Sequence, residues 1–124
     1  MRYRGRHRGY TRLPQPVLVQ RTFTLSRGDG ALTIADVLEG DGVHRLRWHF
    51  HFAPGVAVTI AGEEHIRIRA GAAALELRVP ATLRPALAPA WYSPSYGVRV
   101  PCVCLDVETD ARLDGRREYV WRLA

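Results

Sequence analysis

The sequence contains no lysine and no asparagine, and it has only two cysteines and one methionine. All 18 basic residues are therefore arginine, and with 12 acidic residues they give a net charge of +6. No apolar run approaches the ~20 residues of a transmembrane helix. The lead Met1–Tyr10 lacks the apolar core of a secretory signal peptide. The sequence therefore predicts no membrane span and no signal peptide, and it indicates no particular cellular compartment.

The positive charge favours a polyanionic partner, either an acidic polysaccharide or nucleic acid. A second explanation stays open, because Ala, Gly, Val and Leu are also abundant, as in the product of a GC-rich coding sequence. In that case the arginines are ordinary solvated positions on strand faces. The arginines are spread over most of the chain without interleaved aromatics in an RNA-binding pattern, which speaks against nucleic acid.

The two cysteines, Cys102 and Cys104, lie two residues apart in the alternating run Val100–Val107. On a strand such neighbours point to the same face, about 6.5 Å apart, with parallel side chains, so a disulfide between them is not expected. We predict two small buried thiols that face the core. A metal or redox role is the alternative.

Segments with strand-like alternation recur along the chain and are separated by the turn-forming residues Gly, Pro and Asp. No segment has helical periodicity with capping signals. We predict one all-β domain over residues 1–124, an antiparallel β-sandwich that is part of a larger supersandwich-like fold. Residues 1–13 form an arginine-rich lead, residues 80–89 form a connection, and turns lie at residues 27–30, 39–42, 61–64 and around 113–115. The predicted strands are residues 17–25, 32–38, 44–52, 56–60, 65–69, 73–79, 98–107 and 118–123, with Leu75, Leu77 and Val79 facing inward.

The segment His44–Phe52 alternates most strictly. One face carries Leu46, Trp48, Phe50 and Phe52, and the other carries Arg45, Arg47, His49 and His51. Such alternation is typical of a half-buried antiparallel strand.

His49 and His51 have a spacing that directs two imidazoles to one metal ion. A third ligand would come from His7, His44, His65 or a carboxylate, and no spacing selects one. The alternative is that the two histidines form hydrogen bonds on a solvated sheet face.

Aromatic side chains gather in a proline-bearing segment, where Trp91, Tyr92 and Tyr96 lie near Arg99 in the sequence. Flat rings with a nearby guanidinium suit the apolar face and the carboxylate of a uronic acid. The alternative is that Trp91 caps the core and Tyr96 packs at the entry of a strand.

Several segments, in order, resemble the C-terminal part of the heparinase II/III-like family, which includes alginate and heparin lyases. The run His7–Leu13, followed by Arg21, resembles a His-x-Gly-Tyr-x-x-Leu stretch and the Arg-bearing strand after it. The other matching segments are Leu32–Leu38 with Asp36, Gly40-x-Gly42-x-His44, Trp48–Gly55 with His51 before its proline, and Trp91–Gly97.

The resemblance implies a β-sandwich that accompanies an N-terminal α/α-toroid in enzymes performing β-elimination on uronates. No position here matches the family's catalytic residues, and the region that would hold its metal ligands has no match. We therefore expect a truncated or split lyase portion that is non-catalytic alone and either structural or in contact with acidic polysaccharide. The expected substrate-contacting residues are His7, Tyr10, Arg45, Arg47, His51, Trp91, Tyr92, Tyr96 and Arg99.

No cofactor is expected in this chain, since the resemblance places the zinc of full-length relatives on residues that have no match here. The expected partners are the missing lyase portion, an acidic polysaccharide, or a second copy joined through open sheet edges. Two other readings stay open. One is a free-standing basic β-module that binds a polyanion, and the other is a small metalloprotein built on His49 and His51.

Overall fold

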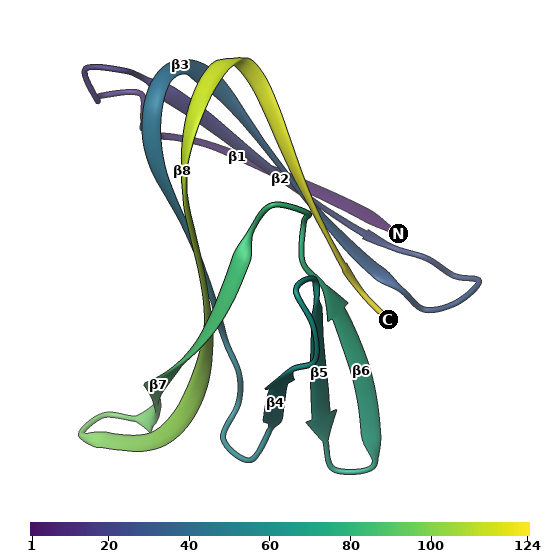
Figure 1. Cartoon of the computed structure of the whole chain (residues 1–124). Coiled ribbons are helices and arrows are strands. Elements are labelled where there is room, and N and C mark those ends of the chain that lie inside the picture. The colour runs from purple at the N-terminus through teal and green to yellow at the C-terminus, as the bar shows by residue number, and fades with distance from the viewer. The chain divides into compact units, whose positions relative to one another are not determined.

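The computed structural model describes residues 1–124, and all its regular elements are strands (Figure 1). The strand pairs with a defined register are all antiparallel, so the all-β prediction is confirmed. The strands are β1 (Arg2–Tyr10), β2 (Val17–Leu25), β3 (Leu32–His51), β4 (Ala57–Ile60), β5 (His65–Ala70), β6 (Ala73–Arg78), β7 (Arg84–Ser95) and β8 (Val98–Leu123).

No helix with the length and apolar character needed to cross a membrane occurs in the structure. The chain divides into two compact units, the first formed by residues 1–46 and 110–124 and the second by residues 47–109. Strands β3 and β8 run through both units.

In the first unit β2 lies between β1 and the start of β3 (Figure 1). Its strands bury a core of apolar side chains, and period-2 alternation explains why they gather on the inward faces. Trp121 is fully buried and Leu113 is nearly so. The other buried apolar residues of this unit are Val17, Ala31, Ile34, Val37, Leu38, Ala111 and Tyr119.

A buried ion pair joins β2 to β3. The Arg21 Nε donates to Asp36 Oδ1 at 2.6 Å, and a terminal guanidinium nitrogen donates to Asp36 Oδ2 at 2.7 Å. Asp36 is only 2% exposed, and it lies directly opposite Arg21 in the register. The hydrogen bond to the carboxylate raises the pKa of Arg21. Arg21 and Asp36 both lie in segments that resemble the lyase family. Their ion pair holds two strands of the first unit together.

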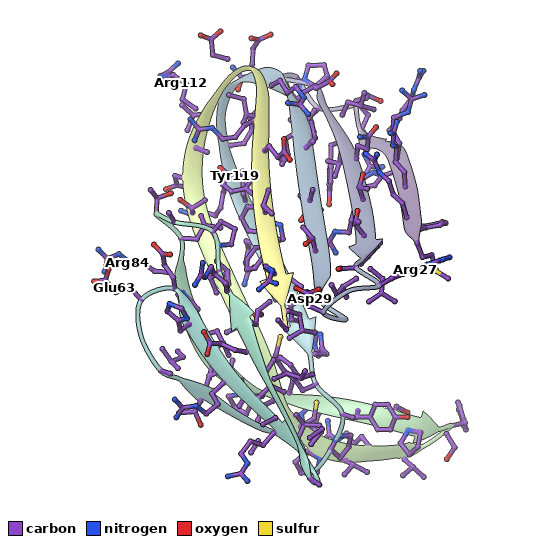
Figure 2. The ribbon with its side chains drawn as sticks, turned by 90° about the vertical axis from the view of Figure 1, so that its right-hand side faces the viewer. Arg27, Asp29, Glu63, Arg84, Arg112 and Tyr119 are labelled. Carbon is purple, nitrogen blue, oxygen red and sulfur yellow. The ribbon has the colours of Figure 1, made fainter.

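The predicted turn at residues 27–30 is confirmed, and it joins β2 to β3. Figure 2 labels Arg27 and Asp29 on this turn. Asp29 Oδ1 accepts a hydrogen bond from the Ala31 backbone N–H at 3.1 Å, and its other oxygen lies 2.7 Å from the Arg122 guanidinium. Several contacts lower the pKa of Asp29, and the hydrogen bond from Ser26 has the largest effect. Gly30 has a positive φ of 70°, as the turn requires.

The turn predicted at residues 39–42 is wrong, because β3 continues through it. Gly40 pairs with Val17, and a Cβ at Gly40 would lie 2.6 Å from the carbonyl oxygen of Pro16. Gly42 takes a positive φ of 88° inside the strand. These glycines therefore permit a close backbone approach and a local bend rather than a chain reversal.

Other predicted boundaries are also corrected. The arginine-rich lead forms β1, and most of the predicted connection at residues 80–89 belongs to β7. No turn separates the last two predicted strands, because Gly115, with a φ of 85°, lies within β8. In each case an element with irregular composition gains its hydrogen bonds from a neighbouring strand that the local sequence does not reveal.

The second unit contains an antiparallel meander of β4, β5 and β6 and a hairpin of β7 with the first half of β8. The predicted turn at residues 61–64 is confirmed between β4 and β5. Leu77 and Val79 are buried as predicted, whereas Leu75, close to the turn between β5 and β6, is 40% exposed. The buried apolar residues of this unit are Trp48, Ile66, Ile68, Leu77, Val79, Leu83, Cys104, Leu105 and Val107.

Candidate functional site

Strand β1 presents a row of four arginines. Arg2, Arg4 and Arg6 alternate along the regularly paired part of the strand and share one of its faces, with about 6.8 Å between neighbours, and Arg8 follows in the bulged end. All four are exposed, and none forms an ion pair with an acidic side chain in the structure. Opposite them on β2 lie the uncharged Thr24, Thr22 and Gln20. The row is therefore a surface of uncompensated positive charge.

The other face of β1 carries the residues between the arginines. Tyr3 lies opposite Phe23, with ring centroids 6.4 Å apart. The His7 Nδ1 accepts a hydrogen bond from the Gly9 N–H at 3.2 Å, and the His7 ring meets Tyr10 edge-on at 5.4 Å. The family-like His-x-Gly-Tyr stretch thus stabilises the bulged end of β1, while His7 and Tyr10 both remain exposed.

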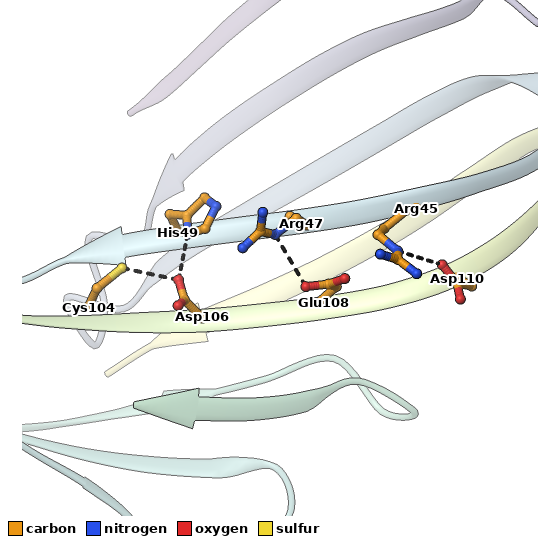
Figure 3. Close-up of polar contacts among 7 residues, drawn as sticks. All are labelled: Arg45, Arg47, His49, Cys104, Asp106, Glu108 and Asp110. Atoms are coloured by element: carbon orange, nitrogen blue, oxygen red, sulfur yellow. Dashed lines mark hydrogen bonds and ion pairs between the residues drawn. The ribbon is translucent and has the colours of Figure 1, made fainter. Parts of the chain in front are cut away.

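In the second unit, the polar face of β3 meets that of β8 in a series of side-chain pairs (Figure 3). Arg47 Nε lies 3.2 Å from Glu108, and His49 Nδ1 lies 2.5 Å from Asp106. The series continues with His51 Nδ1, which is 3.9 Å from the Cys104 sulfur. Each step of two residues forward along β3 is matched by two residues backward along β8, as antiparallel pairing requires.

In the first unit, Arg45 makes a comparable contact, with its Nε 3.3 Å from Asp110. Because Arg45 and Arg47 both face carboxylates, their charges are compensated within the chain. Two of the three arginines that the sequence favoured for a polyanion are thus engaged, whereas the four arginines of β1 form no ion pair.

A cluster of three unlike donors forms at His49, Cys104 and Asp106 (Figure 3). Their ligand atoms all lie within 4.8 Å of one another. Asp106 Oδ1 accepts hydrogen bonds both from His49 and from the Cys104 thiol, the latter at 3.3 Å. The cluster combines an imidazole, a thiol and a carboxylate on one face of two paired strands.

Hydrogen bonds and burial shift the pKa values of two residues in this cluster. The hydrogen bond from His49, followed by that from Cys104, lowers the pKa of Asp106. Burial raises the pKa of Cys104 to about 11, and the neighbouring carboxylate adds to this effect. Without a further cation, the site therefore holds a carboxylate and a neutral thiol at neutral pH.

The cysteines differ in their surroundings. Both are free, Cys104 is 4% exposed, and Cys102 is half-buried. The prediction of two buried thiols is confirmed for Cys104 and wrong for Cys102, and Cys104 shares its face with His49, His51 and Asp106. Cys104 is thus a buried residue of the second unit that also contacts polar side chains.

The aromatic segment lies at the β7–β8 hairpin. The Arg99 guanidinium carbon lies 4.2 Å from the centre of the Trp91 ring, which is a cation–π contact. Trp91 pairs with Pro101 and Tyr92 with Val100, so adjacent positions place the two rings on opposite faces. Tyr96 is fully exposed at the turn. One face of Trp91 is thus covered by Arg99, and the three aromatics do not form one platform.

The predicted site residues therefore separate into groups. The structure brings His7 to Tyr10, Trp91 to Arg99, and His51 to the cluster around Cys104. Sequence reasoning missed Asp106 and the row Arg2, Arg4, Arg6 and Arg8. The spacing Cys104-x-Asp106, identical to that of His49-x-His51, was a usable signal, but the register that places them opposite each other was not visible.

Comparisons with known proteins concern the family and the fold of this chain. The family described as "Heparinase II/III-like, C-terminal" matches residues 2–122. No curated protein sequence matches the chain. Among solved structures, heparan sulfate lyase HepC from Pedobacter heparinus superposes with a TM-score of 0.72 at 11% identity, covering 98% of this chain and 21% of that one.

A second similar structure is that of the heparinase III BT4657 gene product. Its TM-score is 0.62 at 14% identity, over 88% of this chain and 19% of that one. At these identities the likeness concerns the fold, and the chain spans about a fifth of the length of either lyase. Since the family match extends over almost every residue, the chain belongs to the heparinase II/III-like family and corresponds to its C-terminal domain.

Proposed function

We propose that this chain is a non-catalytic part of a polysaccharide lyase and that it contacts acidic polysaccharide through the arginine row of β1. The proposal is supported by a difference in ion pairing between the arginines. Arg45 and Arg47 face carboxylates, whereas Arg2, Arg4, Arg6 and Arg8 form no ion pair.

The geometry of the row suits a linear anionic polymer. Guanidinium groups bind carboxylate or sulfate oxygens through two parallel hydrogen bonds. On β1 these groups recur along an extended strand at about 6.8 Å intervals, so consecutive charges of a stretched chain can meet consecutive arginines. β1 also stands at the end of the strand order, which leaves its length accessible to a long ligand.

A polysaccharide fits the row better than a single-stranded nucleic acid does. Nucleic-acid grooves combine positive charge with aromatic rings on which the bases stack. On β1 the ring of Tyr3 lies on the face opposite the arginines and is directed to Phe23. The arginine face has only Thr and Gln opposite it on β2, which suits hydroxyl groups better than bases.

The non-catalytic part of the proposal rests on the residues themselves. β-Elimination on a uronate needs a base at the C5 proton and groups that neutralise the carboxylate. In the second unit, His49 and His51 face Asp106 and Cys104, and Arg47 faces Glu108, so these side chains already have intramolecular partners.

The proposal is tested by retention on immobilised heparin under a salt gradient, with alginate and single-stranded DNA as other ligands. The test variant carries Arg→Gln at positions 2, 4, 6 and 8, and the matched control carries Arg45→Gln with Arg47→Gln. Four exposed ion pairs at about 0.4 kcal/mol each correspond to a loss of about tenfold in affinity. We expect this loss in the test variant, and less than about twofold in the control.

Equal weakening in both variants would contradict the assignment to β1. Tighter binding to DNA than to either polysaccharide would contradict the ligand class. The non-catalytic part is tested separately, by incubating the chain with heparan sulfate or alginate and following the absorbance of unsaturated uronate. Product formation by the isolated chain would refute it.

A further inference from the structure

We propose that His49, Cys104 and Asp106 bind a zinc ion on the face of the β3–β8 pair in the second unit. The three side chains come from two neighbouring strands, and their ligand atoms lie within 4.8 Å of one another. Thiolate and imidazole ligands select zinc over the hard cations Ca²⁺ and Mg²⁺, which prefer oxygen alone. The site is independent of the arginine row on β1, so either proposal can fail without the other.

Two distances within the cluster can be compared with those of a tetrahedral zinc site. With bonds of about 2.3 Å to sulfur and about 2.0 Å to oxygen, the two ligand atoms are separated by about 3.5 Å. The Cys104 sulfur lies 3.3 Å from Asp106 Oδ1. The contact of 2.5 Å between His49 Nδ1 and Asp106 Oδ1 must open to about 3.3 Å, which small side-chain rotations accomplish.

His51 is a candidate fourth ligand that must move closer, because it lies outside the group of three whose ligand atoms are all within 4.8 Å of one another. Its Nδ1 lies 3.9 Å from the Cys104 sulfur, close to the separation of about 3.6 Å expected for sulfur and nitrogen on one zinc ion. On the other side of β8, Cys104 pairs with Ala88 and Asp106 with Ala86. These small side chains do not cover the cluster from the side of β7, and the side chains of His49 and Asp106 are 43% and 33% exposed.

The charge of the donor set matches a divalent cation. Asp106 contributes a carboxylate, Cys104 contributes a thiolate on binding, and the two histidines bind as neutral imidazoles. The two negative charges balance the +2 charge of zinc. On binding, the Cys104 thiol gives its proton to solvent, and His49 carries its proton on Nε2, so that the lone pair of Nδ1 is free for the metal.

The test uses Co²⁺ and Zn²⁺ with the full chain. A cobalt–thiolate bond produces a charge-transfer absorption that a site without cysteine lacks, and excess Zn²⁺ removes it by displacement. We expect one Co²⁺ per chain with this absorption. The variant Cys104→Ser is expected to lose the absorption and to bind zinc at least about 100-fold more weakly, since even outer-shell changes weaken metal sites 10–100-fold.

Cys102→Ser is the matched control, because Cys102 lies two residues away and outside the cluster. It is expected to keep the absorption and the zinc affinity. Asp106→Asn preserves the size of the side chain and is expected to lose at least about tenfold in affinity. Chemical unfolding of each metal-free variant separates loss of metal from loss of fold.

Three results would overturn the proposal. They are the absence of the charge-transfer band in folded wild-type protein, equal zinc affinity in the wild type and a folded Cys104→Ser variant, and loss of the band in Cys102→Ser but not in Cys104→Ser. The polysaccharide measurements on β1 are made in the absence of metal, and their outcome has no bearing on this one.

Discussion

Replacing Arg21 by alanine removes the bidentate partner of a buried carboxylate. Asp36 is 2% exposed and accepts two hydrogen bonds from Arg21, at 2.6 and 2.7 Å. Removal of one partner of a buried pair costs about 3–5 kcal/mol, because the other charge stays buried without compensation. The Arg21 side chain is 39% exposed and Asp36 makes further interactions, so we expect the lower end, about 3 kcal/mol.

Two variants separate charge from geometry at this pair. Arg21→Lys keeps the positive charge but not the planar fork, and we expect an intermediate loss of about 1–2 kcal/mol. The double variant Arg21→Met with Asp36→Leu removes both charges, and it is expected to be within about 1 kcal/mol of the wild type. If the ion pair acts only through desolvation and hydrogen bonding, Arg21→Ala is the least stable variant, Arg21→Lys is intermediate, and the double variant is closest to the wild type.

The assay is urea unfolding followed by circular dichroism, with the slope and the midpoint fitted separately. A loss of about 3 kcal/mol lowers the midpoint by about 1–3 M at an unchanged slope. A midpoint shift for Arg21→Ala equivalent to less than about 1 kcal/mol would refute the reasoning. So would a double variant less stable than Arg21→Ala.

Three further predictions follow from burial and close approach. Burial raises the pKa of the metal-free Cys104 thiol to about 11, so it is expected to react slowly with iodoacetamide at pH 7.5. The rate is expected to rise about tenfold per pH unit as the pH approaches this pKa, and a rate that is flat from pH 7.5 to 10 would contradict this. Gly40→Ala is expected to cost about 1–3 kcal/mol in unfolding free energy, because its Cβ would lie 2.6 Å from a backbone oxygen, whereas Gly28→Ala, with its nearest contact at 3.9 Å, is expected to be tolerated. Leu77→Ala is expected to lower the unfolding free energy by about 2–4 kcal/mol and Leu75→Ala by less than about 1, since the two are 4% and 40% exposed; equal losses would show that the burial is misassigned.

Local patterns predicted the strands that alternate strictly and the turns that carry Gly or Asp between them. The face of β3 with Trp48 is an example, because its period of two is independent of what the strand pairs with. The sequence did not reveal that β3 and β8 continue through Gly42 and Gly115. A glycine with positive φ serves equally in a turn and in a bend, and only the neighbouring strand decides between them.

The site was predicted less completely than the fold. His49 and His51 were singled out by their spacing, but Cys104 and Asp106 lie more than fifty residues away in the chain. Only the register between β3 and β8 brings the four together. Likewise, sequence patterns could not separate arginines with an ion pair from arginines without one, because the partners of Arg45 and Arg47 come from β8.

The salt dependence of heparin binding tests the central claim most directly. For polyanions, the logarithm of the binding constant falls linearly with the logarithm of salt concentration, with a slope near 0.7–0.9 per charge contact, as measured for nucleic acids. With Arg2, Arg4, Arg6 and Arg8 all replaced by Gln, we predict a slope about three smaller in magnitude than that of the wild type, and no change for Arg45→Gln with Arg47→Gln. An unchanged slope in the β1 variant would contradict the account.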